Sequence, residues 1–82
     1  MSEGTHWHVL LQARPGQAAT MHRAVAAVPG VGHVDTTAGP YDAIAEVSVA
    51  EGMPVGPTLA LLREADGVAL VRTCEHRDVV PA

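Results

Sequence analysis

Apolar and polar side chains alternate in two parts of the chain, and a period of two is typical of β-strands. The first part is residues 5–12, THWHVLLQ, where Leu10 is an apolar exception on the polar side. The second is residues 41–49, YDAIAEVSV, where Ile44 is the exception. The apolar sides consist of Trp7, Val9 and Leu11 in the first segment and of Tyr41, Ala43, Ala45, Val47 and Val49 in the second. Both segments are predicted to be strands with one face in a core.

Apolar residues recur at spacings of three and four in two other parts, which predicts amphipathic helices. The first helix is predicted from Ala18, Met21, Val25 and Val28, with His22 and Arg23 turned away from the core. The dipeptide Pro29-Gly30 ends it, because glycine can take the left-handed cap and proline cannot continue the helix. A shorter helix over residues 58–65 follows a loop rich in glycine and proline, and it buries Leu59 and Leu62.

Residues 31–37 and 68–76 are predicted to be two further strands. The pattern does not assign the core face of the last strand, because Val68 and Leu70 alternate in phase with Arg72. The terminal residues RDVVPA either extend this strand or fray.

The order strand, helix, strand, strand, helix, strand predicts an α+β fold of the ferredoxin-like type, βαββαβ. Its four-stranded antiparallel sheet carries two helices on one face, since both crossovers are expected to be right-handed. Residues 1–82 form one domain, with a core over about residues 5–77. The other face has no helix to cover it, and a second copy of the chain, in a dimer through the sheet, is the simplest cover.

Composition supports oligomerisation and excludes several classes of function. A chain of 82 residues buries a thin core, and its aromatic residues are limited to Trp7 and Tyr41. All five cations are arginines, scattered along the chain against nine carboxylates, which argues against direct DNA binding. The formal charge of -4 fits poorly with anionic membranes.

The compartment is predicted to be the cytoplasm. Cys74 is the only cysteine, which excludes an internal disulfide. Its thiol is either reactive or, more simply, a small buried hydrophobic group in a strand. The first residues, MSEGTHWH, lack the basic and apolar regions of a signal peptide, and no apolar stretch approaches the length of a membrane span. No phosphate loop or other cofactor motif occurs, so no cofactor is expected.

The sequence resembles the effector-binding (RAM) domain of the Lrp/AsnC transcriptional regulators. The resemblance is carried by Pro29-Gly30-Val31 after the first helix, Gly39-Pro40-Tyr41-Asp42 before the third strand, and Gly67-Val68 with Thr73 in the fourth. These pieces lie in register over about residues 7–76. In the family the fourth strand commonly reads Gly-Val-x-x-Thr-x-Thr, and here Val71 takes the place of the first threonine. The chain resembles the stand-alone form, without the helix-turn-helix DNA-binding domain.

The resemblance implies a module for amino-acid sensing and oligomerisation that is not an enzyme. Such domains dimerise through their sheets and assemble further, into tetramers or octamers, and bind amino acids or similar small effectors between dimers. The ligand-binding residues implied here are Gly39, Tyr41, Asp42 and Thr73. A full-length Lrp/AsnC regulator is a further implied partner, so that regulation of transcription is indirect.

Two sets of residues have both a structural and a functional interpretation. Asp42 either binds a ligand or caps the turn, since Asp in turns commonly bonds nearby backbone. His6 and His8 project from one strand face with Glu46 as a neighbour if the first and third strands pair. This set either forms part of a polar dimer interface, with no catalytic residue or metal ligand, or binds a metal. It also supports an alternative function: a small dimeric α+β barrel enzyme, monooxygenase- or isomerase-like, that uses His6 and His8 on the open sheet face.

Overall fold

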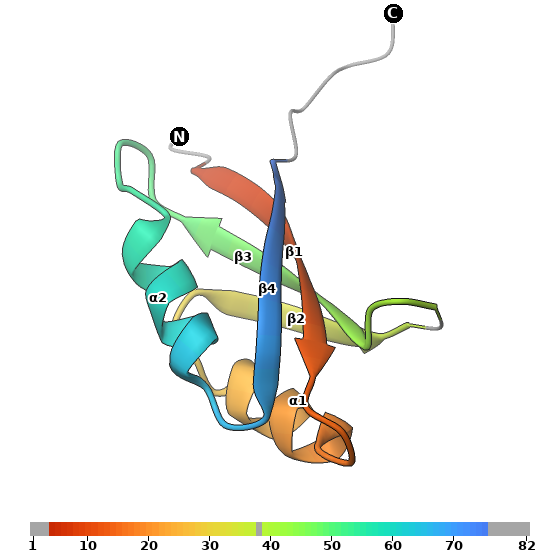
Figure 1. Cartoon of the computed structure of the whole chain (residues 1–82). Helices are drawn as coiled ribbons and strands as arrows, with labels where there is room; N and C mark the ends of the chain where they lie inside the picture. Colours follow the sequence, from red (N-terminus) through yellow and green to blue (C-terminus); the bar gives the residue numbers. More distant parts are fainter. Residues whose placement is uncertain (1–3, 38, 76–82) are drawn as a thin grey trace, which may run out of the picture.

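The computed structural model of the chain describes residues 4–37 and 39–75, and for residues 74 and 75 the backbone alone. The chain order is strand, helix, strand, strand, helix, strand (Figure 1). The elements are β1 (Thr5–Ala13), α1 (Ala18–Ala26), β2 (Val31–Thr36), β3 (Ala43–Val49), α2 (Gly56–Glu64) and β4 (Val68–Glu75). Each agrees with a predicted element to within a few residues at its ends. Among the described residues, neither helix is long and apolar enough to cross a membrane.

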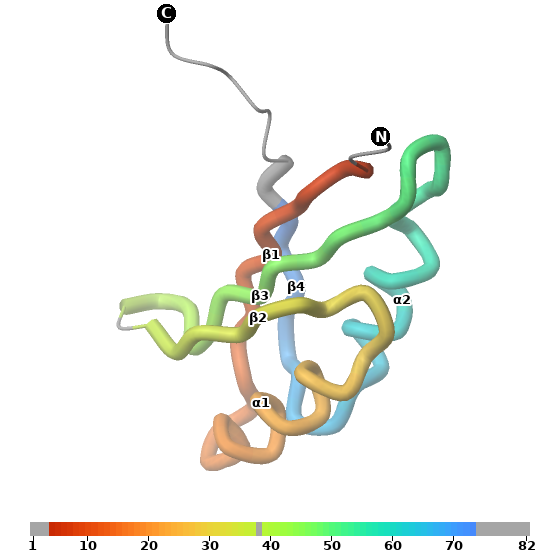
Figure 2. The backbone as a smooth tube through the Cα atoms, turned by 180° about the vertical axis from the view of Figure 1, so that it is seen from behind, coloured from red at the N-terminus to blue at the C-terminus, as the bar shows by residue number. Residues whose placement is uncertain are grey.

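The strands form one four-stranded sheet in the order β2-β3-β1-β4, with every neighbouring pair antiparallel. Each helix connects two strands that are not adjacent, which is the ferredoxin-like arrangement, and the predicted fold class is confirmed. The connection between β2 and β3 projects from the side of the molecule opposite α2, and both views agree on this (Figures 1 and 2). The Gly39–Asp42 segment of this connection is called the corner below.

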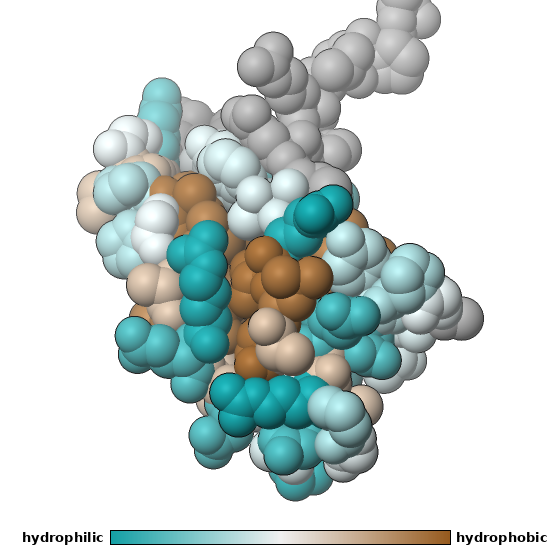
Figure 3. All heavy atoms as spheres, in the orientation of Figure 1, coloured by the Kyte–Doolittle hydropathy of each residue, from teal (hydrophilic) through white to brown (hydrophobic). Residues whose placement is uncertain are grey.

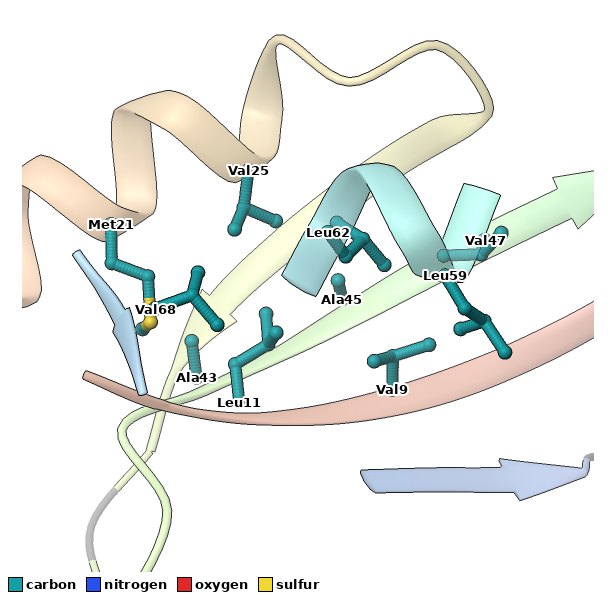
Figure 4. Close-up of a cluster of buried hydrophobic side chains, with 10 residues drawn as sticks. All are labelled: Val9, Leu11, Met21, Val25, Ala43, Ala45, Val47, Leu59, Leu62 and Val68. Atoms are coloured by element: carbon teal, nitrogen blue, oxygen red, sulfur yellow. The ribbon is translucent and has the colours of Figure 1, made fainter. Parts of the chain in front are cut away.

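One face of the sheet and the two helices enclose the core (Figure 4). The sheet contributes alternate residues of its central strands, among them Val9 and Leu11 of β1, and Met21 of α1 and Leu62 of α2 point toward them. Among the side chains that the structure describes, the buried hydrophobic set is Val9, Leu11, Met21, Val25, Ala43, Ala45, Val47, Leu59, Leu62 and Val68. This face is called the helix-covered face, and the opposite one the open face.

An irregularity in β4 decides which of its residues face the core. Ala13 of β1 pairs with Val68, but the next residue back along β1, Gln12, pairs with Leu70, so that Ala69 is left without a partner. Such a bulge shifts the alternation by one position. Val68 is therefore buried and Leu70 is 43% exposed, although their spacing in the sequence would place them on the same face.

Three details differ from the sequence expectations. Ala18 is exposed, so the buried face of α1 begins at Met21. β3 begins at Ala43 rather than at Tyr41, because the backbone at Tyr41 and Asp42 still belongs to the reversal. Tyr41 is half-buried and is not one of the core side chains. The last residue of the predicted strand, His76, the tail RDVVPA and the side chain of Cys74 lie outside what the structure describes, so the expectations for them stay predictions.

Gly67 lets the start of β4 pack directly on α1. A Cβ at this position would lie 2.9 Å from the backbone nitrogen of Met21 and 3.0 Å from the carbonyl oxygen of Gln17, and the φ angle is +84°. Only glycine fits both the contact and the conformation without strain. The Gly67 carbonyl also accepts a hydrogen bond from Arg14 N–H at 2.8 Å, which ties the end of β1 to the same junction.

Candidate functional site

Several hydrogen bonds hold the corner to the strands on either side of it. The Thr37 hydroxyl donates to the Tyr41 carbonyl at 2.7 Å, and Thr37 N–H donates to the Asp42 carbonyl at 3.1 Å. The Gln12 amide nitrogen donates to the Pro40 carbonyl at 2.9 Å from β1. Gly39 has a φ of +110°, and a Cβ there would meet nothing within 4 Å. Gly39 is therefore required by backbone conformation and not by crowding.

Asp42 continues the pairing of β1 and β3 past the point where β3 begins. Its N–H donates to the Leu11 carbonyl at 2.8 Å, and its Oδ2 accepts from Ala13 N–H at 2.7 Å. The chain turns away at this point, so the backbone of β3 offers no acceptor to Ala13, and the carboxylate takes that role. The Asp42 carboxylate therefore has a structural role, but its partner is the distant Ala13 on β1 and not nearby backbone of the turn, as the turn-cap interpretation expected. A carboxylate still has lone pairs to accept from a ligand.

Gly39, Tyr41 and Asp42 lie together on the corner, but Thr73 does not lie near them in one chain. Asp42 bonds to Ala13, whose partner on β4 is Val68, and Thr73 is five residues further along β4, paired with Val9. Five residues of strand span on the order of 15 Å. The four residues implied by the resemblance therefore cannot form one site within a single copy, and a shared site requires residues from two chains.

A hollow of about 430 Å³ lies beside the corner, on the helix-covered side of the sheet. It is bounded by the first half of α1, by the end of β2 and by the start of β3. Its lining residues are Ala18, Ala19, Met21, His22, Arg23, Thr36, Asp42 and Ala43. We call it the α1 hollow. Its floor is apolar, and its rim carries one cation, Arg23, and one anion, Asp42.

His22 is fixed in the wall of the α1 hollow. Its Nε2–H donates to the Val34 carbonyl of β2 at 3.3 Å. β2 is an edge strand, and Val34 would otherwise present this carbonyl to solvent. A smaller hollow of about 150 Å³ lies on the other side of His22, between α1 and β2. The imidazole thus separates two depressions along the same helix edge.

The open face carries polar residues around a small apolar group. Leu10 of β1 and Ile44 of β3 are direct cross-strand partners, and Arg72 of β4 lies beside Leu10. One step along, His8 pairs with Glu46. The predicted neighbourhood of His8 and Glu46 is therefore confirmed, and it follows from the antiparallel pairing of β1 with β3.

Imidazoles on the open face lie near acceptors in the same or the next strand. His8 Nε2 is 4.0 Å from Glu46 Oε2, with the two side chains 43% and 59% exposed. His6 Nδ1 and Ser48 Oγ are 3.0 Å apart, and His33 Nε2–H donates to Asp35 Oδ1 at 2.9 Å. Within the part of the chain that the structure describes, no group of three or more His, Cys, Asp or Glu side chains is arranged to hold a metal ion.

The edge strand β4 carries a second apolar surface. Figure 3 shows a hydrophobic group over β4, bordered by hydrophilic side chains. A hollow of about 220 Å³ here is lined by Arg63 of α2 and by Val68, Ala69, Leu70 and Val71. The bulge at Ala69 turns the strand edge locally, and bulges of this kind commonly limit pairing with another strand.

The sequence interpretation missed the contribution of α1 to a site. Arg23 and His22 were recognised as residues facing away from the core, and Thr36 as part of the strand over residues 31–37, but nothing in their spacing connects them with Asp42. Their proximity depends on α1 lying across β2 and β3. The available signal was the predicted topology, since a helix that follows β1 and precedes β2 must cross this edge of the sheet.

Comparison with known proteins establishes the fold of this two-layer α+β domain. No family model matches the sequence, and no curated protein matches it. The crystal structure of TTHA0845 from Thermus thermophilus has a TM-score of 0.82 with 23% identity over 95% of this chain and 99% of that one. The crystal structure of PH0061 has a TM-score of 0.74 with 15% identity, and the match covers 95% of this chain and 55% of PH0061.

Proposed function

We propose that this chain is a small-molecule sensing and oligomerisation module of the Lrp/AsnC RAM type. The observation that carries the proposal is the corner: a projecting Gly-Pro-Tyr-Asp segment held by hydrogen bonds from Thr37 and Gln12, with a carboxylate at its base. A site fixed in advance loses little entropy when a ligand binds. The motif glycines also support the resemblance, since Gly39 and Gly67 both have positive φ angles.

The open face supports assembly as a homodimer. Its centre is the cross-strand pair of Leu10 and Ile44, and Leu70 on the same side is 43% exposed. A second copy placed over this face would bury these side chains, as expected for a small domain with a thin core. Further association into tetramers or octamers would let the corner of one chain meet Thr73 of another.

In this proposal the chain acts on transcription indirectly. An amino acid or similar effector changes the assembly of the module, and the module in turn associates with a full-length Lrp/AsnC regulator. The module itself does not contact DNA, which agrees with its scattered arginines and its formal charge of -4. Its location in this proposal is the cytoplasm.

Titration with a panel of amino acids tests the sensing function. We expect a subset of amino acids to release or absorb heat in calorimetry and to raise the melting temperature, because a ligand that binds only the folded state stabilises it. Native mass spectrometry of the same samples reports the oligomer and the bound ligand together. Absence of heat and of thermal stabilisation with every amino acid would reject the sensing function.

Assembly through the open face is tested by placing a charge at its apolar centre. Ile44→Glu should shift the protein to monomers in sedimentation velocity, because an unpaired carboxylate in an apolar interface is costly. Leu61→Glu is the matched control, since Leu61 is 47% exposed on α2, away from the sheet. Equal oligomer sizes for the two variants would contradict assembly through this face.

A second candidate is the small dimeric α+β barrel enzyme, and the observation that favours it is the imidazole–carboxylate pair of His8 and Glu46. We favour the binding module because the side chains of His8 and Glu46 are 43% and 59% exposed on an open strand face, whereas catalytic groups generally lie in a cleft that excludes water. His8→Ala distinguishes the candidates: an enzyme would lose its activity, and a sensor would keep its ligand affinity as long as it assembles.

A further inference from the structure

The α1 hollow has the size and the lining of a ligand site that one chain provides alone. We propose that it binds a small aliphatic α-amino acid, with the carboxylate at Arg23 and the ammonium at Asp42. This inference rests on the proposed sensing function and gives it a location, on the helix-covered side of the sheet, and a ligand class. It assigns roles to residues of α1 that the sequence resemblance does not include.

Size separates this hollow from its neighbours. Its volume of about 430 Å³ falls within the range of about 300–1,000 Å³ that is usual for small-molecule sites. The hollow along β4 has about 220 Å³ and the one between α1 and β2 about 150 Å³. Both are below that range, so of these three depressions the α1 hollow is the one with room for an amino acid.

The charged residues of the rim come from two different elements. Arg23 extends from α1, and its planar guanidinium can donate two parallel hydrogen bonds to a carboxylate. Asp42 lies at the base of the corner, where its Oδ2 accepts from Ala13 N–H. A carboxylate has two oxygens and about four acceptor positions, so the same group can also accept from a ligand ammonium. A cation and an anion on one rim match a zwitterion.

The apolar floor of the α1 hollow determines which amino-acid side chain fits. Ala18, Ala19 and Ala43 are small, and with Met21 they leave an apolar floor that suits an aliphatic side chain. A charged or strongly polar side chain would lose water here and find few partners beyond the Thr36 hydroxyl and the His22 ring. His22, held by Val34, closes the hollow on the β2 side.

The hollow lies between α1 and the ends of β2 and β3 on the helix-covered side of the sheet, whereas Leu10 and Ile44 lie on the open face. Dissociation of a dimer that forms through the open face should therefore leave the hollow intact. A site between dimers would instead be lost on dissociation. The monomeric state of the Ile44→Glu variant can therefore separate the two locations.

Calorimetry with three related probes tests the assignment: L-leucine, L-leucinamide, which lacks the carboxylate, and 4-methylpentanoate, which lacks the ammonium. L-leucine should bind most tightly.

Arg23→Gln should lower the affinity for L-leucine about tenfold or more, the usual effect of removing one charge-assisted hydrogen bond, and should leave the affinity for L-leucinamide unchanged. Asp42→Asn should weaken L-leucine and leave 4-methylpentanoate unchanged, because the Asn oxygen can still accept from Ala13. Arg63→Gln, the loss of an arginine on α2, is the matched control and should change none of these affinities.

Ile44→Glu should keep one L-leucine site per chain as a folded monomer. If L-leucine binds but Arg23→Gln and Asp42→Asn leave its affinity unchanged, the site is elsewhere: the inference fails and the sensing function stands. Loss of L-leucine binding in folded Ile44→Glu would also overturn the inference, in favour of a site between chains. If none of the amino acids binds, the sensing function and the inference fail together.

Discussion

The two faces of the sheet differ sharply although they share the same strands. On the helix-covered face, Val9, Leu11 and Ala45 are fully buried among apolar neighbours. On the open face, Leu10, Ile44 and His8 are only partly buried, and Glu46 is exposed. Consecutive residues of one strand therefore experience a close-packed interior and a surface that water or a partner covers. Variants at neighbouring positions of one strand can therefore distinguish effects on the stability of the monomer from effects on assembly.

The largest expected effect comes from Leu11→Ala on the helix-covered face. Leu11 is fully buried, and its truncation removes apolar contacts and leaves a cavity, so the free energy of unfolding should fall by about 2–5 kcal/mol. Leu10→Ala is the matched variant in the adjacent position and should cost the monomer about 1 kcal/mol or less. Urea denaturation at low protein concentration measures both. Equal losses would mean that the two faces are equally important to the monomer.

The bulge in β4 provides the next comparison. Val68→Ala should lower the free energy of unfolding by about 2 kcal/mol, because Val68 is 4% exposed and loses two buried methyl groups. Leu70→Ala, two residues further along, should change it by about 0.5 kcal/mol or less, since Leu70 is 43% exposed. The same denaturation series reports both variants. A larger loss at Leu70 than at Val68 would contradict the register shift at Ala69.

Val68 and Leu70 also show which part of the fold the sequence predicts and which part it does not. The periods of β1, α1 and β3 are regular, so their positions and buried faces follow from the sequence, and the topology follows from their order. The core face of β4 could not be predicted, because the unpaired residue Ala69 reverses the alternation of core and open positions. No residue type in this segment indicates such a bulge. Tyr41 was placed in the core by extending the alternation of β3 backward, past the point where the backbone turns.

The candidate site was predictable only in part, for a related reason. The corner is a continuous motif, so its position and its reversal of the chain follow from the sequence. The acceptor role toward Ala13 and the approach of Arg23 and Thr36 join residues from distant parts of the chain. The first depends on the register of β1 with β3 and the second on how α1 crosses the sheet, and residue spacing gives neither. The position of Thr73 along β4 likewise became clear only from the strand register.

A smaller effect is expected at Asp42, which lies where β1 ends and β3 begins. Asp42→Ala leaves the partly buried Ala13 N–H without its acceptor and should lower the free energy of unfolding by about 1–2 kcal/mol. Asp42→Asn should cost less, because its side-chain oxygen can still accept the same hydrogen bond. Thermal denaturation of both variants checks the order. If Asn is as destabilising as Ala, the negative charge rather than the hydrogen bond stabilises the corner.

The smallest effect is expected on the open face itself, at the His8–Glu46 pair. Because the two atoms are 4.0 Å apart and the side chains of His8 and Glu46 are 43% and 59% exposed, Glu46→Gln should change the stability of the monomer by about 0.5 kcal/mol or less. A double-mutant cycle with His8→Gln, measured in the Ile44→Glu background, gives the coupling energy of the pair without assembly. Repeating the cycle in the assembled protein then tests whether the open face is covered, since a desolvated pair loses its exposure to water and its coupling should rise. If the coupling energy is equally small in both backgrounds, the pair is still exposed to water in the assembled protein, and the assembly surface is elsewhere on the chain.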